Sequence, residues 1–518
     1  MDEATIVAPP RLVQEIQGLL ITTVSGFLQA RLKILSAENM RFLCEPWVHF
    51  FVHSALHRTE LHGLPSSRTR DVANYPPERT VPGDTLSFFE YFRTPQYRQY
   101  LDATLTGEEA ALDCRAEVHL LGETPNRLAS TVCYKPCFPR DFRYRLQLYS
   151  LGRIGFLQDK AIPFETPTDW ALRARLAAAI RAVLAQQPTE LADWLAERAA
   201  ELCPKSLLEH LPTNYAEKLH SAPRQALFSA DAWHIIDDWK VYALAQKNRH
   251  GARWIGAPNA LSHGSLAVFW QREFEISVLD TYLTWGWIAP TSVHCQLIQF
   301  NSPHFAGRTQ PQPVRTIHNQ GILISAAARP RHLLEYPYTP ERFGHYLTTQ
   351  LDLATAAHTL SGQPVAIRTR PRDLGWDVKT MVQALGLPQV TLEFQEGKFS
   401  ERLAQSKLHI CDNCSTTIAE SLWANHPTLI LINEDYFQIP PAAAPEYAKL
   451  ASVGIFHQDK ETLFHHLVMM GNNIDAWWSS PQTQQAISDF LQQQGRTGST
   501  ITVWKQALLT PVPNFNSA

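Results

Sequence analysis

Short apolar runs alternate with amphipathic stretches throughout the chain from residue 321 onward. The runs predict six strands, at 321–328, 365–370, 390–394, 408–412, 428–433 and 454–457. The stretches between them predict helices over 339–360 and 415–424 and helices that begin near Trp376, Ser400 and Pro441. Strands that alternate with helices form a parallel sheet with helices on both faces, so this half predicts a doubly wound α/β domain.

The first half has a less regular pattern. Residues 11–35 and 40–58 predict helices, 64–83 is a Pro-rich loop, and two Ala/Leu-rich helices are expected over 168–187 and 189–203. Apolar runs then predict strands at 225–230, 252–258 and 277–287. We therefore expect an α/β domain over 1–310 with a helical elaboration, a second over 311–480, and helices over 481–518 that pack back toward the first. The polar, Pro- and Gly-rich segment 303–316 is the expected hinge.

Composition narrows the function classes. A chain of 518 residues exceeds one ordinary core, and a formal net charge of -3 argues against a nucleic-acid partner, which needs clustered Lys and Arg. The acidic start MDEAT does not resemble a secretory signal, and no apolar run reaches the ~18 residues of a membrane span. The expected location is cytoplasmic, with at most a peripheral contact with the inner membrane.

Eight cysteines are too few for a disulfide scaffold in a chain of this length. Cys411 and Cys414 form a CxxC, and Cys133 and Cys137 form a CxxxC, so a redox pair or a zinc site has to be weighed. No cluster of histidines lies beside either pair in the sequence, and we expect reduced structural thiols.

Polar residues gather where the 408–412 strand gives way to a helix. Asp412 ends the strand, and Ser415, Thr416 and Thr417 stand at the helix start. Thr417 and Glu420 have the spacing of a capping box, which would leave Ser415, Thr416 and backbone N–H groups free to bind a phosphate. The alternative is that these residues only cap the helix.

Three arginines stand at alternate positions across the carboxyl end of the 365–370 strand, Arg368, Arg370 and Arg372. Guanidinium groups bind phosphate or carboxylate through two hydrogen bonds, so a donor nucleotide or an acidic sugar would suit them. A solvated basic edge is the alternative. No Asp-x-Asp follows a strand end, and we expect neither a metal nor another cofactor.

The chain resembles a family of bacterial transferases associated with surface-carbohydrate loci, distant relatives of capsule and lipopolysaccharide glycosyltransferases of GT-B type. The resemblance rests on six segments, ENMRFLCEPWVHFF at 38–51, DDWKVYALA at 237–245, DTYLTWGW at 280–287, RTRPRDLGW at 368–376, DNCSTTIAESLWANHPTLILIN at 412–433 and AWW at 476–478. It implies two Rossmann-like domains that face a cleft.

This resemblance also implies an activity, the metal-independent transfer of a sugar from a nucleotide-activated donor to a surface glycan, glycolipid or glycoprotein. A CMP-linked ulosonic acid is the favoured donor, because relatives in capsule synthesis use such donors and the arginines suit a sugar carboxylate. A CDP-linked polyol phosphate or a UDP-sugar is an alternative. A second alternative is a catalytically silent binding or scaffold protein of a glycan-assembly complex.

The family's loop of Gly-Gln-His-Gly-Gly type is altered here to IGAPNALSHGS at 255–265, where Pro258 occupies the position of the histidine. His263 is the nearest imidazole and the first candidate for the proton-transfer group, although a solvated loop histidine is the alternative. Asp280, and Glu273 with Glu275 before it, are the candidate carboxylates.

Asp238 and Lys240 are assigned to the acceptor side or to a structural pair at a helix start.

Overall fold

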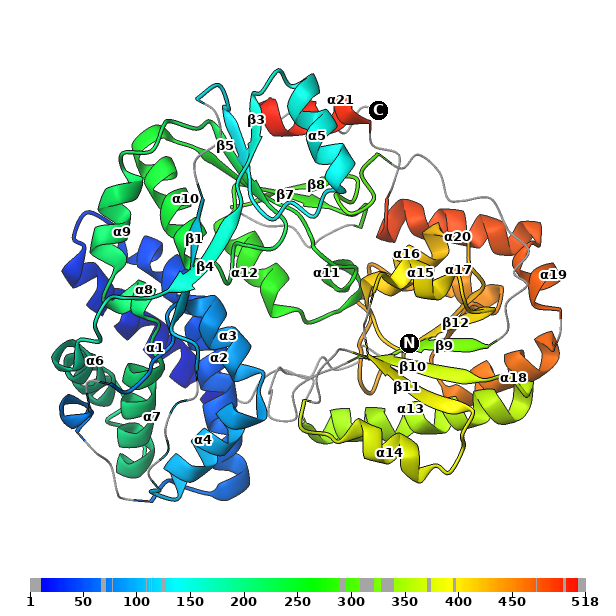
Figure 1. The fold of residues 1–518 in the computed structure, drawn as a ribbon, viewed down its shortest axis with the longest axis horizontal. Helices are drawn as coiled ribbons and strands as arrows, with labels where there is room; N and C mark the ends of the chain where they lie inside the picture. The colour runs from blue at the N-terminus through cyan, green and yellow to red at the C-terminus, as the bar shows by residue number, and fades with distance from the viewer. Residues whose placement is uncertain are drawn as a thin grey trace.

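The computed structural model describes residues 11–66, 71–76, 78–108, 110, 112, 114–122, 127–287, 294–307, 321–327, 340–369, 374–394, 397–471, 473–496 and 500–510. Figure 1 shows two lobes side by side, each built around a sheet. The strands are β1 Glu117–Leu121, β2 Thr131–Cys133, β3 Ile154–Phe156, β4 Asp159–Pro163, β5 Ala226–Ser229, β6 Arg253–Gly256, β7 Thr281–Thr284, β8 Gln296–Gln299, β9 Ile322–Ser325, β10 Val365–Thr369, β11 Val390–Phe394, β12 Leu408–Cys411, β13 Thr428–Leu431 and β14 Phe456–His457.

The helices that enclose these strands fall into three groups. In the first domain they are α1 Arg11–Arg31, α2 Ala37–His62, α3 Thr85–Phe92, α4 Pro95–Leu105, α5 Arg140–Tyr149, α6 Trp170–Val183, α7 Thr189–Leu202, α8 Lys205–Leu208, α9 Leu211–Lys218, α10 Asp237–His250, α11 Ser262–Ser265 and α12 Trp270–Val278. In the second they are α13 Pro340–Ser361, α14 Val378–Ala384, α15 Phe399–Leu403, α16 Thr416–Trp423, α17 Ala444–Ser452, α18 Lys460–Met470 and α19 Ile474–Trp478. The last two are α20 Pro481–Gln494 and α21 Ile501–Leu509, and a 3-10 turn covers Val72–Asn74.

The second domain is a parallel sheet of six strands in the order β11-β10-β9-β12-β13-β14. This is the order of a Rossmann fold, and each strand lies in one of the six predicted segments. Residues on β9, β12 and β13 are buried throughout, because helices cover both faces. The doubly wound prediction for this half is confirmed.

The first domain also holds a parallel sheet of six strands, in the order β3-β2-β5-β6-β7-β8. Together the two sheets make the GT-B-like architecture that the sequence predicted, with two Rossmann-like domains. The pair β1 and β4 forms a separate antiparallel ribbon, and helices α1 to α4 with α6 to α9 make the helical elaboration beside the sheet (Figure 1).

One predicted strand was wrong over part of its length. Residues 277–278 end helix α12, and only Thr281–Thr284 of the 277–287 segment forms a strand. The cause is Arg272, whose guanidinium donates hydrogen bonds to the carbonyl oxygens of His263, Leu266 and Ala267 and so fixes α12 against the preceding loop. These contacts override the β-branched composition of the segment.

The last two helices belong to different lobes. Helix α20 packs against α16 and α17, and α21 packs against α5, β3 and β5. Between them, the N–H of Arg496 donates to the oxygen of Trp285 at 2.8 Å, and the Arg496 oxygen accepts from the N–H of Ser302 at 2.9 Å. A Cβ at Gly286 would lie 2.5 Å from a backbone oxygen of α20, so this crossing needs glycine. Most of the expected hinge, from residue 308 on, lies outside the described residues.

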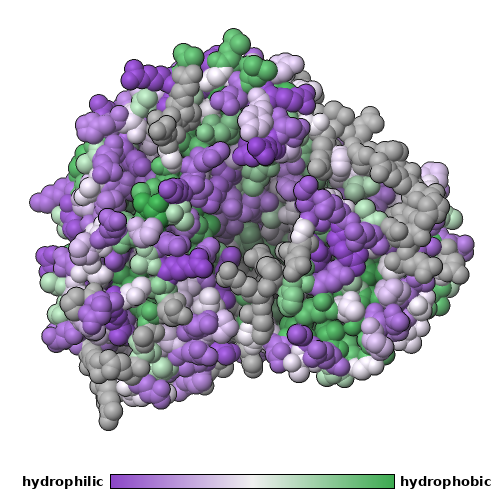
Figure 2. Space-filling model, in the orientation of Figure 1, coloured by the Kyte–Doolittle hydropathy of each residue, from purple (hydrophilic) through white to green (hydrophobic). Residues whose placement is uncertain are grey.

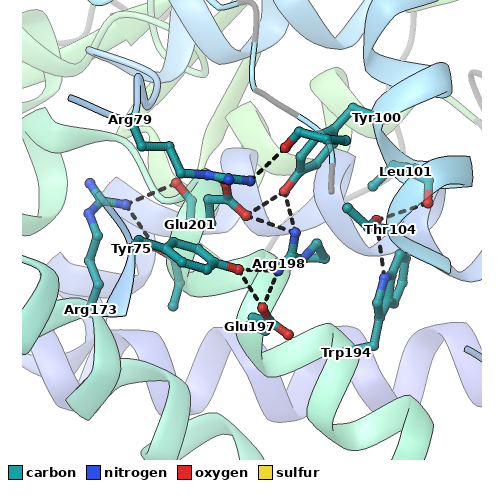
Figure 3. A network of polar contacts seen from close by, with 12 residues as sticks. Tyr75, Arg79, Tyr100, Leu101, Thr104, Arg173, Trp194, Glu197, Arg198 and Glu201 are labelled. Carbon is teal, nitrogen blue, oxygen red and sulfur yellow. Dashed lines mark hydrogen bonds and ion pairs between the residues drawn. The ribbon is translucent and has the colours of Figure 1, made fainter. Parts of the chain in front are cut away.

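A buried ionic cluster holds the helical elaboration together (Figure 3). Arg198 on α7 contacts Glu197, Glu201 at 2.9 Å and the hydroxyl of Tyr100 at 2.9 Å. Glu201 also pairs with Arg79, which ties the loop before α3 to α7. Pairing and hydrogen bonds are what allow charges to be buried in this way.

Across the part of the chain that the structure describes, no helix combines the length and the apolar character needed to cross a bilayer.

Candidate functional site

A row of buried and partly buried polar side chains lies at the carboxyl edge of the first sheet. Asp231 follows β5, Asn259 and His263 follow β6, and Tyr282 is on β7. The Asn259 amide donates to Asp231, and its Oδ1 lies 3.0 Å from Nε2 of His263. Nδ1 of His263 lies 2.7 Å from the Tyr282 hydroxyl. These four residues form one continuous hydrogen-bonded chain, which we call the β5–β7 polar chain.

Glu275 on α12 extends this chain into the protein. It is fully buried beside Tyr282, accepts a hydrogen bond from Gln271 at 3.0 Å and lies 3.6 Å from Nδ1 of His234. Burial raises the pKa of Glu275 to about 8, and it raises the pKa of Asp231 as well. Burial, with Arg272 nearby, lowers the pKa of His263 well below its usual value, so its ring is neutral at pH 7. Carboxyl groups of raised pKa in a polar cluster suit proton transfer.

Two glycines allow this packing. A Cβ at Gly256 would lie 2.3 Å from the Leu279 side chain and 3.0 Å from the Tyr282 ring, and one at Gly264 would lie 2.4 Å from the Trp287 indole. Tyr282 can therefore approach β6, and Trp287 can approach α11, only because these two positions lack a side chain.

The predicted hydroxyl cluster stands at the start of α16, as the pattern indicated, but the capping-box prediction was wrong. Helix α16 begins at Thr416 with Ser415 as its N-cap, and Ser415 makes no side-chain capping bond. Thr417 instead lies 2.5 Å from the Ser415 hydroxyl and 3.2 Å from Cys411 Sγ, which removes it from the capping position. Glu420 lies 2.7 Å from His304, in the segment after β8.

Asp412 and Arg368 are buried at the carboxyl edge of the second sheet. Asp412 accepts hydrogen bonds from Tyr346 at 2.6 Å and Gln350 at 3.0 Å, so it fixes α13 to the end of β12. Burial raises the pKa of Asp412 to about 6. Arg368 on β10 donates to the oxygen of Gly397 at 3.2 Å and lies two strands from β12, about 10 Å away. Arg370 and Arg372 lie outside the described residues.

The two clusters flank contacts between the domains. Cys414, next to Ser415, has its Sγ 3.7 Å from the oxygen of Ser265 on α11, two residues after His263. The N–H of Ala267 donates to the oxygen of Gln438 in the second domain at 2.8 Å. Figure 2 shows a hollow between the two lobes with mostly hydrophilic residues around it. Helix α11 lies at the boundary of the lobes beside α16 (Figure 1).

Four predicted site residues lie elsewhere. Asp280 precedes β7 and so lies at the amino edge of the sheet, where it accepts from Lys247 and the N–H of Trp254, both at 2.7 Å. Glu273 is exposed on α12, 3.5 Å from Arg272. Asp238 and Lys240 are buried in α10 but do not pair with each other, because Asp238 binds Lys218 and Lys240 binds Asp237.

The sequence did not single out Asp231, His234, Asn259 or Tyr282. A usable signal exists for two of them, since Asp231 and Asn259 each follow a short apolar strand within three residues, where ligands of parallel sheets bind. Tyr282 and Glu275 carry no such signal, because their role depends on how α12 packs on β7.

All eight cysteines are free thiols. Burial raises the pKa of Cys411 to about 11, so this thiol stays protonated at neutral pH. Within the described ranges, three or more His, Cys, Asp or Glu side chains do not come together in a geometry suited to a metal ion.

Comparison with protein-family models matches residues 116–508 to the LIC12162 family transferase. No curated protein matches the chain by sequence.

Weak likenesses to solved structures accompany the family match. TarM has 10% identity and a TM-score of 0.36, with 57% of each chain covered. The pneumococcal O-GlcNAc transferase GtfA has 9% identity and a TM-score of 0.36, covering 59% of this chain and 60% of its own. MurG of Acinetobacter baumannii has 13% identity and a TM-score of 0.33, covering 70% and 98%. The chain thus spans less than two thirds of TarM and of GtfA, and likenesses of this size do not carry function from one protein to another.

Proposed function

The chain belongs to the LIC12162 family of transferases, and on that premise we propose that it is a glycosyltransferase that uses a nucleotide-activated sugar as donor. One observation carries the proposal. The β5–β7 polar chain of the first domain and the hydroxyl cluster of the second lie against the same interdomain contact, that of Ser265 with Cys414. Glycosyl transfer needs these two elements together, a group that accepts the acceptor's proton and a site that stabilises the leaving phosphate.

The proton-accepting side is the β5–β7 polar chain. The His263 ring is fully buried and both its nitrogens are engaged, so we assign it the central position in the chain. Asp231 and Asn259 are the two members of the chain that are only partly buried, and of these the Asp231 carboxylate receives the proton from the acceptor hydroxyl. Its raised pKa brings its basicity closer to neutral pH. Asn259 and His263 orient the carboxylate.

The leaving-group side is the first turn of α16. The amide groups of a first helical turn have no intrahelical partner, and the Ser415 hydroxyl is not used as a cap. Ser415 and Thr416 are both partly exposed, so hydroxyls and amides together offer hydrogen-bond donors to a phosphate. These groups need no metal, and the proposed mechanism is metal-independent.

Among donors we favour a CMP-linked ulosonic acid, whose carboxylate suits the arginines of 368–372. A CDP-linked polyol phosphate or a UDP-sugar would occupy the same phosphate site. The acceptor is a surface glycan, glycolipid or glycoprotein held by the first domain.

A donor panel tests the proposal. The purified chain is incubated with CMP-, CDP-, UDP-, GDP- and dTDP-linked sugars, with and without EDTA, and released nucleotide is measured. We expect release from one donor class at the same rate in EDTA. A rate that EDTA abolishes refutes the metal-independent mechanism. Failure to bind any of the nucleotides at millimolar concentration by calorimetry refutes the transferase proposal in favour of a binding or scaffold role.

A further inference from the structure

Helix α5 presents an unusual outer face. Phe142 and Leu146 are buried in the first domain's core, as expected of an amphipathic helix. The opposite side is also apolar, with Tyr144 62%, Leu148 72%, Tyr149 60% and Leu151 82% exposed. Leu151 and Leu148 are the two most exposed large apolar side chains of the described chain. We call these four residues the α5 patch, and exposed apolar groups gathered in this way mark a contact surface.

The backbone accounts for the exposure of Leu151. Leu151 has φ 53°, in the left-handed region that leucine rarely adopts, and Gly152 follows with φ 75°. This conformation ends α5, since the N–H of Leu151 donates to the oxygen of Leu148 at 2.9 Å and the N–H of Gly152 donates to the oxygen of Gln147 at 3.0 Å. The helix end therefore keeps the Leu151 side chain out of the core and in solvent.

Charge surrounds the α5 patch. Residues 140–153 carry four arginines and one aspartate, in a chain whose formal net charge is -3. Arg140, Arg145 and Arg153 are exposed, and none of them forms an ion pair with a residue that the structure describes. Lys505 on α21 adds a cation, since its Nζ donates to the oxygen of Tyr149 at 3.3 Å.

Helix α5 lies with α21 at the outer end of the first domain (Figure 1). The same end of the space-filling view shows hydrophobic residues beside hydrophilic ones (Figure 2).

We propose that the α5 patch and its arginines dock this protein on an anionic lipid bilayer. Leucine and tyrosine side chains enter the boundary between headgroups and acyl chains, and arginines bind lipid phosphates beside them. Charge complementarity selects this occupant, because cations that pair with no acidic residue of the described chain, around an apolar centre, match an anionic headgroup layer. The first domain thereby holds its acceptor side next to a membrane.

Vesicle sedimentation tests the docking. The full chain is mixed with vesicles of phosphatidylglycerol and phosphatidylcholine, or of phosphatidylcholine alone, at low salt and at about 0.5 M salt. We expect binding to the anionic vesicles at low salt, a loss of binding at high salt, and at least about tenfold weaker partitioning for the zwitterionic vesicles. Equal partitioning to both vesicle types overturns the proposal, and so does an absence of binding.

Variants locate the surface. The double variants Leu148→Ser with Leu151→Ser and Arg145→Gln with Arg153→Gln are each expected to weaken partitioning by about tenfold or more. Leu360→Ser with Met469→Ser, which removes exposed apolar side chains from α13 and α18, is the matched control and should bind as the unaltered chain does. Circular dichroism and nucleotide binding confirm that each variant is folded.

Partitioning unchanged in both α5 variants overturns the assignment. Light scattering gives a second test. If the chain is a dimer in the absence of lipid and the variant Leu148→Ser with Leu151→Ser is a monomer, the proposal is overturned, because the α5 patch then binds a second copy of the chain. Neither result bears on the donor panel, so docking and transfer fail independently.

Discussion

The hydroxyl of Tyr282 lies 2.7 Å from Nδ1 of His263, and both side chains are fully buried. This contact joins a strand of the sheet to the short helix that touches the second domain. The Tyr282 oxygen orients the imidazole at Nδ1 and the Asn259 amide oxygen orients it at Nε2, and the first prediction removes the Tyr282 oxygen.

Replacing Tyr282 with phenylalanine keeps the ring and deletes the hydroxyl. Turnover should fall about 10- to 100-fold, because a buried imidazole nitrogen left without a partner costs about 1–3 kcal/mol and the polar chain loses its alignment. Steady-state kinetics should show the loss in kcat with the KM for donor unchanged. Tyr97→Phe is the control, since it also deletes a buried hydroxyl bond, to Ser54 at 2.7 Å, but within the helical elaboration. Equal turnover in both variants would remove the polar chain from the mechanism.

The hydroxyl cluster gives the second prediction. Changing Ser415 and Thr416 together to alanine should weaken nucleotide binding by about tenfold or more, because each charge-assisted hydrogen bond to a phosphate is worth about 1.5–3 kcal/mol. The melting temperature should change little, since Ser415 makes no capping bond and its hydrogen bond to Thr417 is only partly buried. Calorimetry measures the affinity. Unaltered nucleotide affinity in the folded double variant would mean that the hydroxyl cluster has a structural role at the start of α16 and does not bind the phosphate.

Glu275 makes stability depend on pH. Its pKa is near 8 in the folded chain and about 4.5 when unfolded, so the folded state holds the extra proton between these values. The stability it contributes is therefore full below pH 4.5 and is lost as pH rises toward 8, at up to about 1.4 kcal/mol per pH unit.

Glu275→Gln removes this titration. Relative to the unaltered chain, the variant should gain melting temperature steadily from about pH 5 to about pH 8.5. The comparison within one pair of proteins cancels the other titrating groups. A difference between the two melting temperatures that stays constant over this range would contradict the raised pKa.

The buried guanidinium of Arg198 gives the fourth prediction, which concerns stability. Arg198→Met removes the buried cation that contacts both Glu197 and Glu201, which costs about 3–5 kcal/mol. Arg181→Met is the matched control on α6, where the pair with Asp193 is exposed and contributes about 0–1 kcal/mol. Urea unfolding should separate the two variants clearly, with nucleotide affinity unchanged in both. Equal midpoints would mean that the cluster in Figure 3 contributes little to stability.

The sequence predicts the second domain well, because its strands are buried on both faces and read as uninterrupted apolar runs between helical stretches. Thr428–Leu431 illustrates this, since all four residues are buried. The strands of the first domain are harder to predict from the sequence. Strands β2 and β3 have three residues each, too few for a periodic signal, and the strand predicted at 277–287 begins inside α12 because Arg272 fixes that helix from outside the segment.

The candidate site likewise has one part that the sequence predicts and one part that it does not. The start of α16 is visible in the sequence because Ser415, Thr416 and Thr417 follow a strand directly. The β5–β7 polar chain is not, because Asp231, Asn259, His263 and Tyr282 come from different loops and a strand, and only the parallel order of β5, β6 and β7 brings them together. Asp280 was chosen as a candidate because it is close in sequence to the 255–265 loop. In the structure it lies at the opposite edge of the sheet.

Helix α21 has a consequence for how the chain is made. Trp504 inserts among Phe138, Phe228 and Phe300 of the first domain, and the hydroxyl of Thr131 on β2 donates to the oxygen of Leu508, 377 residues later in sequence, at 2.8 Å. During synthesis, the core of the first domain therefore lacks the side chains of α21 until the second domain has left the ribosome. Contacts of such long range form slowly and leave apolar surface exposed in the interval. A helix that is synthesised after the second domain completes the core of the first, so the two lobes mature together although each has its own sheet.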